Sequence, residues 1–236
     1  MDYELSVERL FESLISGDRT GSQKMVKELT DRGTRASDLI SHVFWPTYSL
    51  IEKLHREDQL SRVSYQLATR LLRVLQDRAA ATLPREAARP DSIFACCGPT
   101  DGDELGAQMA VDLLESSGYQ IIFAGGNIPA DEVLAQVHET RPDYLLMFAS
   151  GPSDLPGIRH ILDSLREINA VPNLKVAVGG GVFNRAEGLA EEIGVHLSAQ
   201  SPMDMVELLT SGEATQIAAE VDSQRREMAR RRRKAA

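Results

Sequence analysis

The stretch IFACCGPTDGDELG, residues 93–106, decides the fold of this chain. Its apolar beginning, residues 93–97, predicts a buried strand, and residues 105–116 follow a helical pattern. A strand that turns directly into a helix is the repeating unit of open parallel sheets, which bind ligands outside the carboxyl ends of their strands. We therefore expect the loop between Thr100 and Gly106 to border a binding crevice.

The chain after Pro90 alternates between short apolar runs and helical patterns. Nearly uniformly apolar strands separated by helices are typical of a parallel sheet covered on both faces. This order predicts an α/β fold with a flavodoxin-like (Rossmann-type) five-stranded parallel sheet. The predicted strands are residues 93–97, 120–124, 144–149, 175–178 and 195–197, and the predicted helices are residues 105–116, 130–139, 155–168, 184–192 and 203–209.

The first part of the chain carries helical patterns only, which predicts an N-terminal four-helix bundle. One pattern ends at Gly17 and a second near Gly33. The third, residues 39–54, contains Pro46, which should kink or split the helix because proline lacks a backbone donor. The fourth covers residues 60–81. Its inward face is expected to comprise Val63, Leu67, Leu71, Val74 and Leu75.

Two prolines divide the chain. Pro84 and Pro90 bracket a polar stretch between the helical patterns and the alternating ones. We therefore expect a helical bundle cap domain over residues 1–84 and an α/β domain over residues 90–212. Residues 213–236 should form a basic C-terminal helix or tail.

Composition and charge narrow the functional classes. No apolar stretch approaches the roughly 20 residues of a membrane span, and the acidic start of the chain lacks the regions of a signal peptide. The adjacent Cys96 and Cys97 cannot form a disulfide framework, which indicates a cytoplasmic protein. The formal net charge of −9 disfavours nucleic-acid binding by the body of the chain, so that only the basic residues 225–234 are candidates for such a contact.

The pattern Asp101-x-Asp103-x-x-Gly106 resembles the Asp-x-His-x-x-Gly signature of cobalamin-binding domains. A helical cap followed by a five-stranded α/β domain also resembles the corrinoid-binding modules of methionine synthase, corrinoid methyl-carrier proteins and B12-dependent photoreceptor regulators. The resemblance implies cobalamin as the cofactor. It also places Asp103 where the family has its cobalt-ligating histidine, a neutral imidazole that a carboxylate cannot reproduce.

Further landmarks of the resemblance follow in order. The turn 125–129 is similar to the family's Gly-x-x-x-Pro turn, and Gly179-Gly180 is similar to its double glycine. In the family, the nucleotide tail of the corrinoid enters a slot between sheet and helix, where glycines let the backbone come close. Gly106 would permit close packing of its helix on a strand. The serine expected after the third strand falls on Phe148, and Ser150 substitutes for it only if the loop shifts register.

The cap of the photoreceptors places a tryptophan, a glutamate and a histidine over the upper face of the corrin. The matching positions here read approximately Leu54, Tyr65 and Gln66, with Trp45 earlier on the preceding helix. We assign no catalytic residue and no metal ligand. The predicted cofactor-binding residues are Asp101, Asp103, Gly106, Ser150, Gly179, Gly180, Trp45, Tyr65 and Gln66.

Several functions stay open from the sequence. The main hypothesis is a cobalamin-binding sensor that acts through cap contacts with a regulatory partner protein, as a homo-oligomer. The alternatives are a corrinoid methyl carrier for a methyltransferase, a heme- or bilin-binding protein, and an interaction module without a cofactor. The candidate ligands for a heme iron are His42, His55, Cys96 and Cys97, although small apolar cysteines are also typical of a buried strand.

An enzyme in its own right is not indicated, because the chain has no nucleophile elbow, Walker loop or zinc-ligand spacing. The acidic residues Asp101, Asp103 and Glu104 fit either a cation site or a helix N-terminus, where the helix dipole favours negative charge.

Overall fold

A five-stranded parallel sheet in the order β2-β1-β3-β4-β5 forms the centre of the α/β domain. The computed structural model describes residues 3–168 and 170–235, and their side chains except those of residues 224–226 and 228–235. The strand order confirms the predicted flavodoxin-like fold. The strands are β1 (Ser92–Cys97), β2 (Gln120–Gly126), β3 (Tyr144–Phe148), β4 (Lys175–Gly179) and β5 (Leu197–Ala199).

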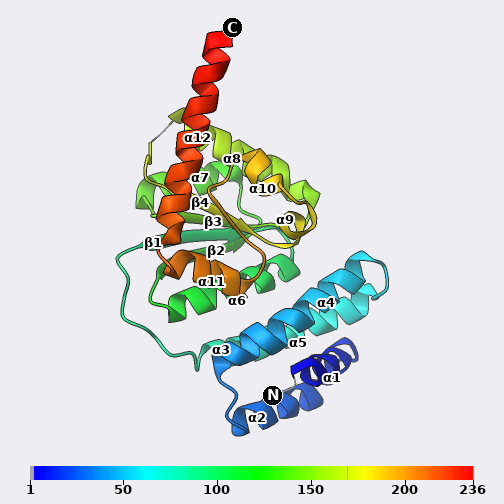
Figure 1. The fold of residues 1–236 in the computed structure, drawn as a ribbon. Helices are drawn as coiled ribbons and strands as arrows, with labels where there is room; N and C mark the ends of the chain where they lie inside the picture. The colour runs from blue at the N-terminus through cyan, green and yellow to red at the C-terminus, as the bar shows by residue number, and fades with distance from the viewer. Residues whose placement is uncertain (1–2, 169, 236) are drawn as a thin grey trace.

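Helices cover both faces of the sheet (Figure 1). The face toward the N-terminal bundle carries α6 (Asp101–Ser116) and α11 (Pro202–Thr210), which pack against each other. The opposite face carries α7 (Ala130–Thr140) and α8 (Leu155–Ile168). Because all strands are parallel, the carboxyl ends of β1 and β3–β5 open onto the same edge of the sheet.

The prediction of one helix over residues 184–192 is wrong, because two short helices occupy this segment. These are α9 (Gly181–Arg185) and α10 (Leu189–Ile193). Gly188 lies between them with φ of +77°, a left-handed conformation that ends a regular helix and suits glycine.

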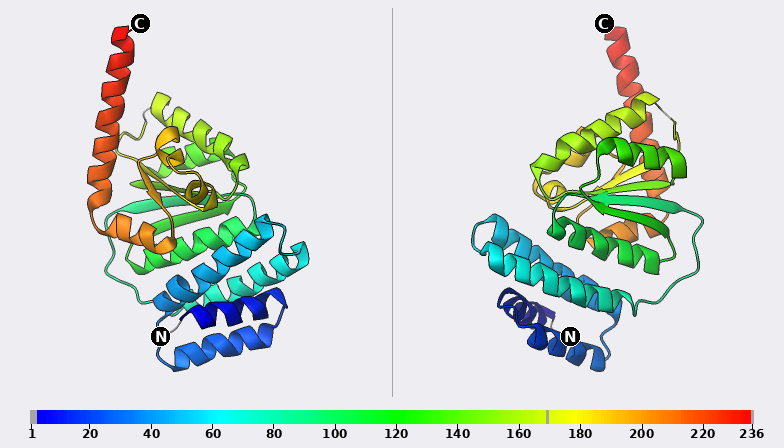
Figure 2. Two further views of the ribbon diagram at one scale, coloured as in Figure 1. Left: turned by 45° about the vertical axis from the view of Figure 1, so that its right-hand side comes forward. Right: turned by 180° about the vertical axis from the view of Figure 1, so that it is seen from behind.

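The N-terminal residues form the predicted bundle of helices, which lies beside α6 (Figure 2). Pro46 interrupts the third helix as predicted, through a five-residue π-helical turn directly before it. Wider turns of this kind commonly mark bends where the backbone ladder is disturbed. The segments of the bundle are α1 (Tyr3–Ile15), α2 (Arg19–Asp31), α3 (Ala36–Leu39), the π turn η1 (Ile40–Phe44), α4 (Trp45–Arg56) and α5 (Arg62–Ala80).

The expected inward face of α5 is wrong at its N-terminal end. Val63 is 70% exposed and Leu67 is 40% exposed. Leu67 packs over Gly17 at the end of α1, where a Cβ would lie 3.3 Å from its Cδ1 atom. The helix instead turns a different stripe inward because it contacts both α1 and α6. The buried residues of this stripe are Tyr65, Ala68, Thr69, Leu72, Leu75, Gln76 and Ala79.

Helix α6 joins the bundle to the sheet, since it is apolar on two faces. Leu105 and Met109 belong to the core of the bundle. Ala107 and Leu114 belong to the core between the sheet and α11. The position of α6 therefore fixes how its N-terminal loop meets both the cap and the strand ends.

The last helix, α12 (Glu213–Ala235), extends past the α/β domain away from the bundle (Figure 1). Its first half is attached near β4 and β5. The backbone N–H of Val176 donates to His196 Nδ1 at 2.8 Å, and His196 Nε2 lies 3.3 Å from Asp222 Oδ1. The basic side chains within 225–234, on which the expected nucleic-acid contact depends, lie outside the described residues. Within the described part of the chain, no helix is long and apolar enough to cross a membrane.

Candidate functional site

Two adjoining cavities lie where the cap meets the carboxyl ends of the strands. The narrow cavity lies between α6, α11 and the ends of β3–β5, and its empty space of about 440 Å³ includes space open to solvent. The wide cavity, about 1950 Å³, lies between α4 and α5 on one side and the loops after β1 and β3 on the other. Together they form one cleft. The residues that line both cavities are Trp45, Tyr48, Asp103, Ser150 and Gly181.

The first turn of α6 is held by a capping box. The Thr100 hydroxyl accepts a hydrogen bond from the backbone N–H of Asp103 at 3.1 Å. In return, Asp103 Oδ2 accepts from the Thr100 backbone N–H at 3.0 Å and from the Thr100 hydroxyl at 2.6 Å. This reciprocal arrangement satisfies donors that a helix N-terminus leaves free. It therefore fixes the position of the Asp103 carboxylate.

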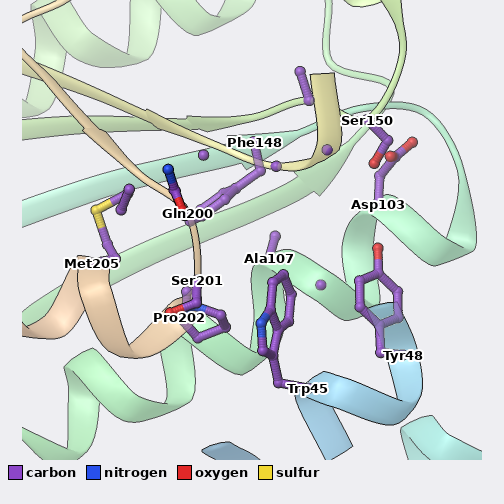
Figure 3. A pocket seen from close by; sticks show the side chains of 17 residues that line it. Trp45, Tyr48, Asp103, Ala107, Phe148, Ser150, Gln200, Ser201, Pro202 and Met205 are labelled. Atoms are coloured by element: carbon purple, nitrogen blue, oxygen red, sulfur yellow. The ribbon is translucent and has the colours of Figure 1, made fainter. Parts of the chain in front are cut away.

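The second oxygen of Asp103 has no hydrogen-bond partner among the described residues, although Asp103 is only 6% exposed. Figure 3 shows the carboxylate near the Tyr48 hydroxyl and Ser150 at the edge of the narrow cavity. A buried acceptor without a partner costs about 1–3 kcal/mol. A ligand with a donor group in this cleft would remove that cost.

Two tyrosines of the cap lie next to the first turns of α6. The Tyr48 hydroxyl donates a hydrogen bond of 3.0 Å to the Gly102 carbonyl. The Tyr65 hydroxyl donates to Glu52 Oε1 at 2.7 Å, and the ring of Tyr65 stacks on His55 at 3.9 Å between centroids. These side chains form the cap side of the cleft.

Burial shifts the pKa values of the side chains on the cap side of the cleft. Desolvation raises the pKa of Glu52 above its ordinary value, although the hydrogen bond from Tyr65 opposes the shift. Desolvation also raises the pKa of Tyr65 and of Tyr48, helped by the negative charge of Glu52. Both tyrosines therefore keep their protons at neutral pH and act as hydrogen-bond donors.

Glycines form part of the wall of the narrow cavity. Gly180 has φ of +103°, and a Cβ there would overlap the backbone of Ala149, so that no other residue fits without strain. A Cβ on Gly179 would lie 3.2 Å from Phe148 Cδ1. Phe148 is 9% exposed and lines the narrow cavity.

All nine predicted cofactor-binding residues line this cleft. Those at the narrow cavity are Trp45, Asp103, Gly106, Ser150, Gly179 and Gly180, and those at the wide cavity are Trp45, Tyr65, Gln66, Asp101, Asp103 and Ser150. One expected role is wrong. Gly106 packs against the cap and not against a strand, since a Cβ there would lie 2.8 Å from the Tyr48 hydroxyl oxygen.

Tyr48 and Glu52 are among the cleft residues that sequence reasoning missed. Their spacing from Trp45 carries the signal, because residues three and seven positions along a helix share one face with the first. Trp45, Tyr48 and Glu52 all line the wide cavity.

The residues proposed for a heme alternative are scattered. Cys96 and Cys97 line another cavity, of about 820 Å³, on the side of α7 and α8. Burial raises the pKa of each thiol to about 12. His42 stacks on Tyr3 in the bundle at 5.2 Å, and His55 alone of the four lines the wide cavity. Among the described residues, no three His, Cys, Asp or Glu side chains cluster to hold a metal ion.

The comparison with known families covers the region that forms this cleft. Residues 92–204 match the family described as the B12 binding domain. These residues belong to the B12-binding domain family. The assignment agrees with the predicted resemblance and supports cobalamin as the predicted cofactor.

Individual relatives agree with this assignment. The chain is 26% identical over 111 residues to dimethylamine corrinoid protein 1 of Methanosarcina acetivorans, which covers 46% of this chain and 51% of the relative. It is 31% identical over 91 residues to the methanol–corrinoid protein of Methanosarcina barkeri, covering 38% of this chain and 34% of the relative. The chain thus spans about half, or less, of the length of these curated relatives.

A solved structure matches more of the chain. The monomethylamine corrinoid protein of Methanosarcina barkeri superimposes with a TM-score of 0.76 at 15% identity, over 85% of this chain and 94% of the other. At this identity the likeness shows the fold. The superposition extends beyond the α/β domain, because it covers 85% of this chain, whereas the B12-binding match covers only residues 92–204.

The residues of the cleft fit a corrinoid by two observations of this structure. The unpartnered Asp103 oxygen offers a buried acceptor to the amide groups at the edge of a corrin. Gly179 and Gly180 leave their own part of the wall of the narrow cavity without side chains, and Gly180 has a positive φ.

Proposed function

We propose that this chain is a corrinoid carrier protein, which holds cobalamin between the cap and the strand ends and presents it to a separate methyltransferase. The joined pair of cavities, about 1950 Å³ and 440 Å³, is the observation that carries this proposal. When bound, a corrinoid supplies a cobalt centre that can accept and donate a methyl group. The chain itself would bind and orient it.

The two cavities suit the two parts of such a cofactor. The wide cavity matches a flat macrocycle, which the cap would cover with Trp45 and Tyr65. The narrow cavity matches an extended tail, because Gly179 and Gly180 let the backbone come close. Tyr48 would keep the cap in place through its bond to Gly102.

The carrier hypothesis is better supported than the sensor hypothesis. The relatives are named as corrinoid proteins for dimethylamine and methanol, and the solved neighbour as a monomethylamine corrinoid protein. None of the described residues forms a catalytic set that would make this chain the methyltransferase. The partner we propose is therefore a methyltransferase.

One observation keeps the sensor as a second candidate. Asp103 occupies the position of the histidine in the Asp-x-His-x-x-Gly signature and is fixed in a capping box. A carboxylate does not supply the neutral nitrogen that softer metal centres favour. A protein that binds cobalamin without transferring methyl groups is compatible with this change.

Reconstitution tests the proposal. Purified protein mixed with hydroxocobalamin and then desalted should keep the red corrin absorbance at close to one equivalent, and incubation with hemin should leave no Soret band. After chemical reduction, the bound corrinoid should accept a methyl group from methyl iodide and keep it through a second desalting. Colourless protein would overturn corrinoid binding. Bound corrinoid that takes no methyl group, with an oligomeric state that changes with ligand or light, would favour the sensor.

A further inference from the structure

The carboxylate of Asp103 is divided between two environments. Oδ2 accepts two hydrogen bonds from Thr100, at 3.0 and 2.6 Å. Oδ1 has no partner among the described residues, and the side chain is 94% buried, with 6% exposed. Buried acceptors are nearly always paired in folded proteins. An unpaired one at the wall of a cavity therefore points to a group that the cavity receives.

No described residue donates a hydrogen bond to Oδ1, although the Ser150 hydroxyl lies near the carboxylate in Figure 3. Oδ2 packs beside Gly98, where a Cβ would lie 2.7 Å from it. The Tyr48 hydroxyl, which is near the carboxylate in Figure 3, donates to the Gly102 carbonyl and has no second proton to give. A donor group of the occupant of the cleft would complete the hydrogen bonding of Oδ1.

The capping box also restricts what Asp103 can do toward a metal. It holds Oδ2 at Thr100, so that only Oδ1 could approach a metal without loss of the cap. As a hard oxygen donor on a short side chain, the carboxylate suits cations such as Mg²⁺ better than a corrinoid cobalt.

We infer that Asp103 binds the corrinoid as a hydrogen-bond acceptor through Oδ1 and does not ligate its cobalt. The inference rests on the proposed function, and it assigns to this chain a way of holding the cofactor that differs from a protein-nitrogen ligand. The group recognised is an N–H or O–H donor at the face of the macrocycle that meets α6. The cobalt face on that side then receives no ligand from Asp103.

The first test uses reduced cobinamide, a corrinoid that has no nucleotide base. Its cobalt(II) form, bound to the native protein, is measured by electron paramagnetic resonance. A nitrogen ligand would split each cobalt line into three, whereas the inference predicts unsplit lines. Threefold splitting would show that a protein nitrogen ligates cobalt and would overturn the inference.

Two substitutions test the hydrogen bond. Asp103→Leu should weaken binding of hydroxocobalamin about tenfold, the equivalent of about 1.4 kcal/mol, and leave the cobinamide resonance unchanged. Asp103→Asn keeps one acceptor oxygen, which cannot serve both Thr100 and the occupant, so its affinity should fall between those of the native protein and Asp103→Leu. A changed resonance in Asp103→Leu would identify Asp103 as a ligand, and unchanged affinity would remove the hydrogen bond, so either result overturns the inference.

A matched control separates binding from folding. Asp18 caps α2 by accepting from the Gly21 backbone N–H at 2.8 Å and lines neither cavity of the cleft. Asp18→Leu should lose a similar amount of stability in thermal unfolding and bind hydroxocobalamin normally. If the native protein binds neither hydroxocobalamin nor cobinamide, the proposed function fails and this inference fails with it. If it binds both and Asp103→Leu binds equally well, only the inference fails.

Discussion

The Tyr48 hydroxyl of the cap donates a 3.0 Å hydrogen bond to the Gly102 carbonyl, in the first turn of α6. Tyr48 is buried and also lines both cavities of the cleft. The same side chain therefore holds the cap on the α/β domain and forms part of the proposed cofactor site. Cap position and cofactor binding should depend on each other.

Tyr48→Phe tests this dependence. The variant removes one buried hydrogen bond, so the free energy of unfolding in urea should fall by about 0.5–1.5 kcal/mol, and hydroxocobalamin should bind more weakly. Tyr119→Phe is the matched control, since the Tyr119 hydroxyl donates to the Leu209 carbonyl at 2.6 Å within the α/β domain. It should lose similar stability and bind normally. Equal binding by both variants would argue against Tyr48 as part of the site.

Gly102→Ala should disturb the cap more strongly. A Cβ at Gly102 would overlap the Tyr65 hydroxyl and lie 2.6 Å from Glu52 Oε1. Overpacking of this kind costs about 1–3 kcal/mol, which a shift of the thermal midpoint would report. Gly157→Ala in α8 is the control, because a Cβ there meets nothing within 4 Å. It should be neutral or slightly stabilising, and a larger loss there than at Gly102 would contradict the described contact.

Asp112 should make stability depend on pH. Burial raises its pKa from the ordinary 3.8 to about 6, although the hydrogen bond from Gln76 Nε2, at 2.7 Å, opposes the shift. A raised carboxyl pKa stabilises the folded state fully below pH 3.8, and this contribution is lost as the pH rises through about 6. Urea unfolding from pH 4 to pH 8 should therefore show Asp112→Asn gaining stability relative to the native protein. Parallel profiles for the two proteins would contradict the shift.

Phe148→Ala should separate stability from cofactor binding. Loss of a buried phenylalanine costs about 3–5 kcal/mol, but it also enlarges the narrow cavity that Phe148 lines. Hydroxocobalamin should then bind at least as tightly as it binds the native protein. Phe183→Ala, a buried residue in the core on the other face of the sheet, is the control. It should lose similar stability without any gain in affinity. Weaker binding by Phe148→Ala alone would show that the ring contacts the cofactor.

The sequence was sufficient to predict the sheet and most of the helices, because burial on both faces makes parallel strands uniformly apolar. It placed the start of α6 four residues late, at Leu105, where the structure begins the helix at Asp101. Asp101-Gly102-Asp103 has low helix propensity. The reciprocal bonds between Thr100 and Asp103 help to extend the helix to this point.

The cap side of the cleft was harder to predict. The helical spacing of Trp45 and Tyr48 shows that they share a face, but it does not show whether that face meets α2, α5 or α6. That choice depends on contacts distant in sequence, such as the bond from Tyr48 to Gly102. The sequence also placed the last strand two residues early, at 195–197. A strand this short has too few residues for a clear pattern, and its position depends on pairing with β4, such as Ala199 with Gly179.

Trp45 is the only tryptophan of the chain and lines both cavities, so its fluorescence reports on the cleft directly. Titration with hydroxocobalamin, corrected for absorbance with free N-acetyltryptophanamide, should quench this emission saturably at one equivalent per chain. Emission that stays constant after that correction would show that no corrinoid enters the cleft between the cap and the strand ends.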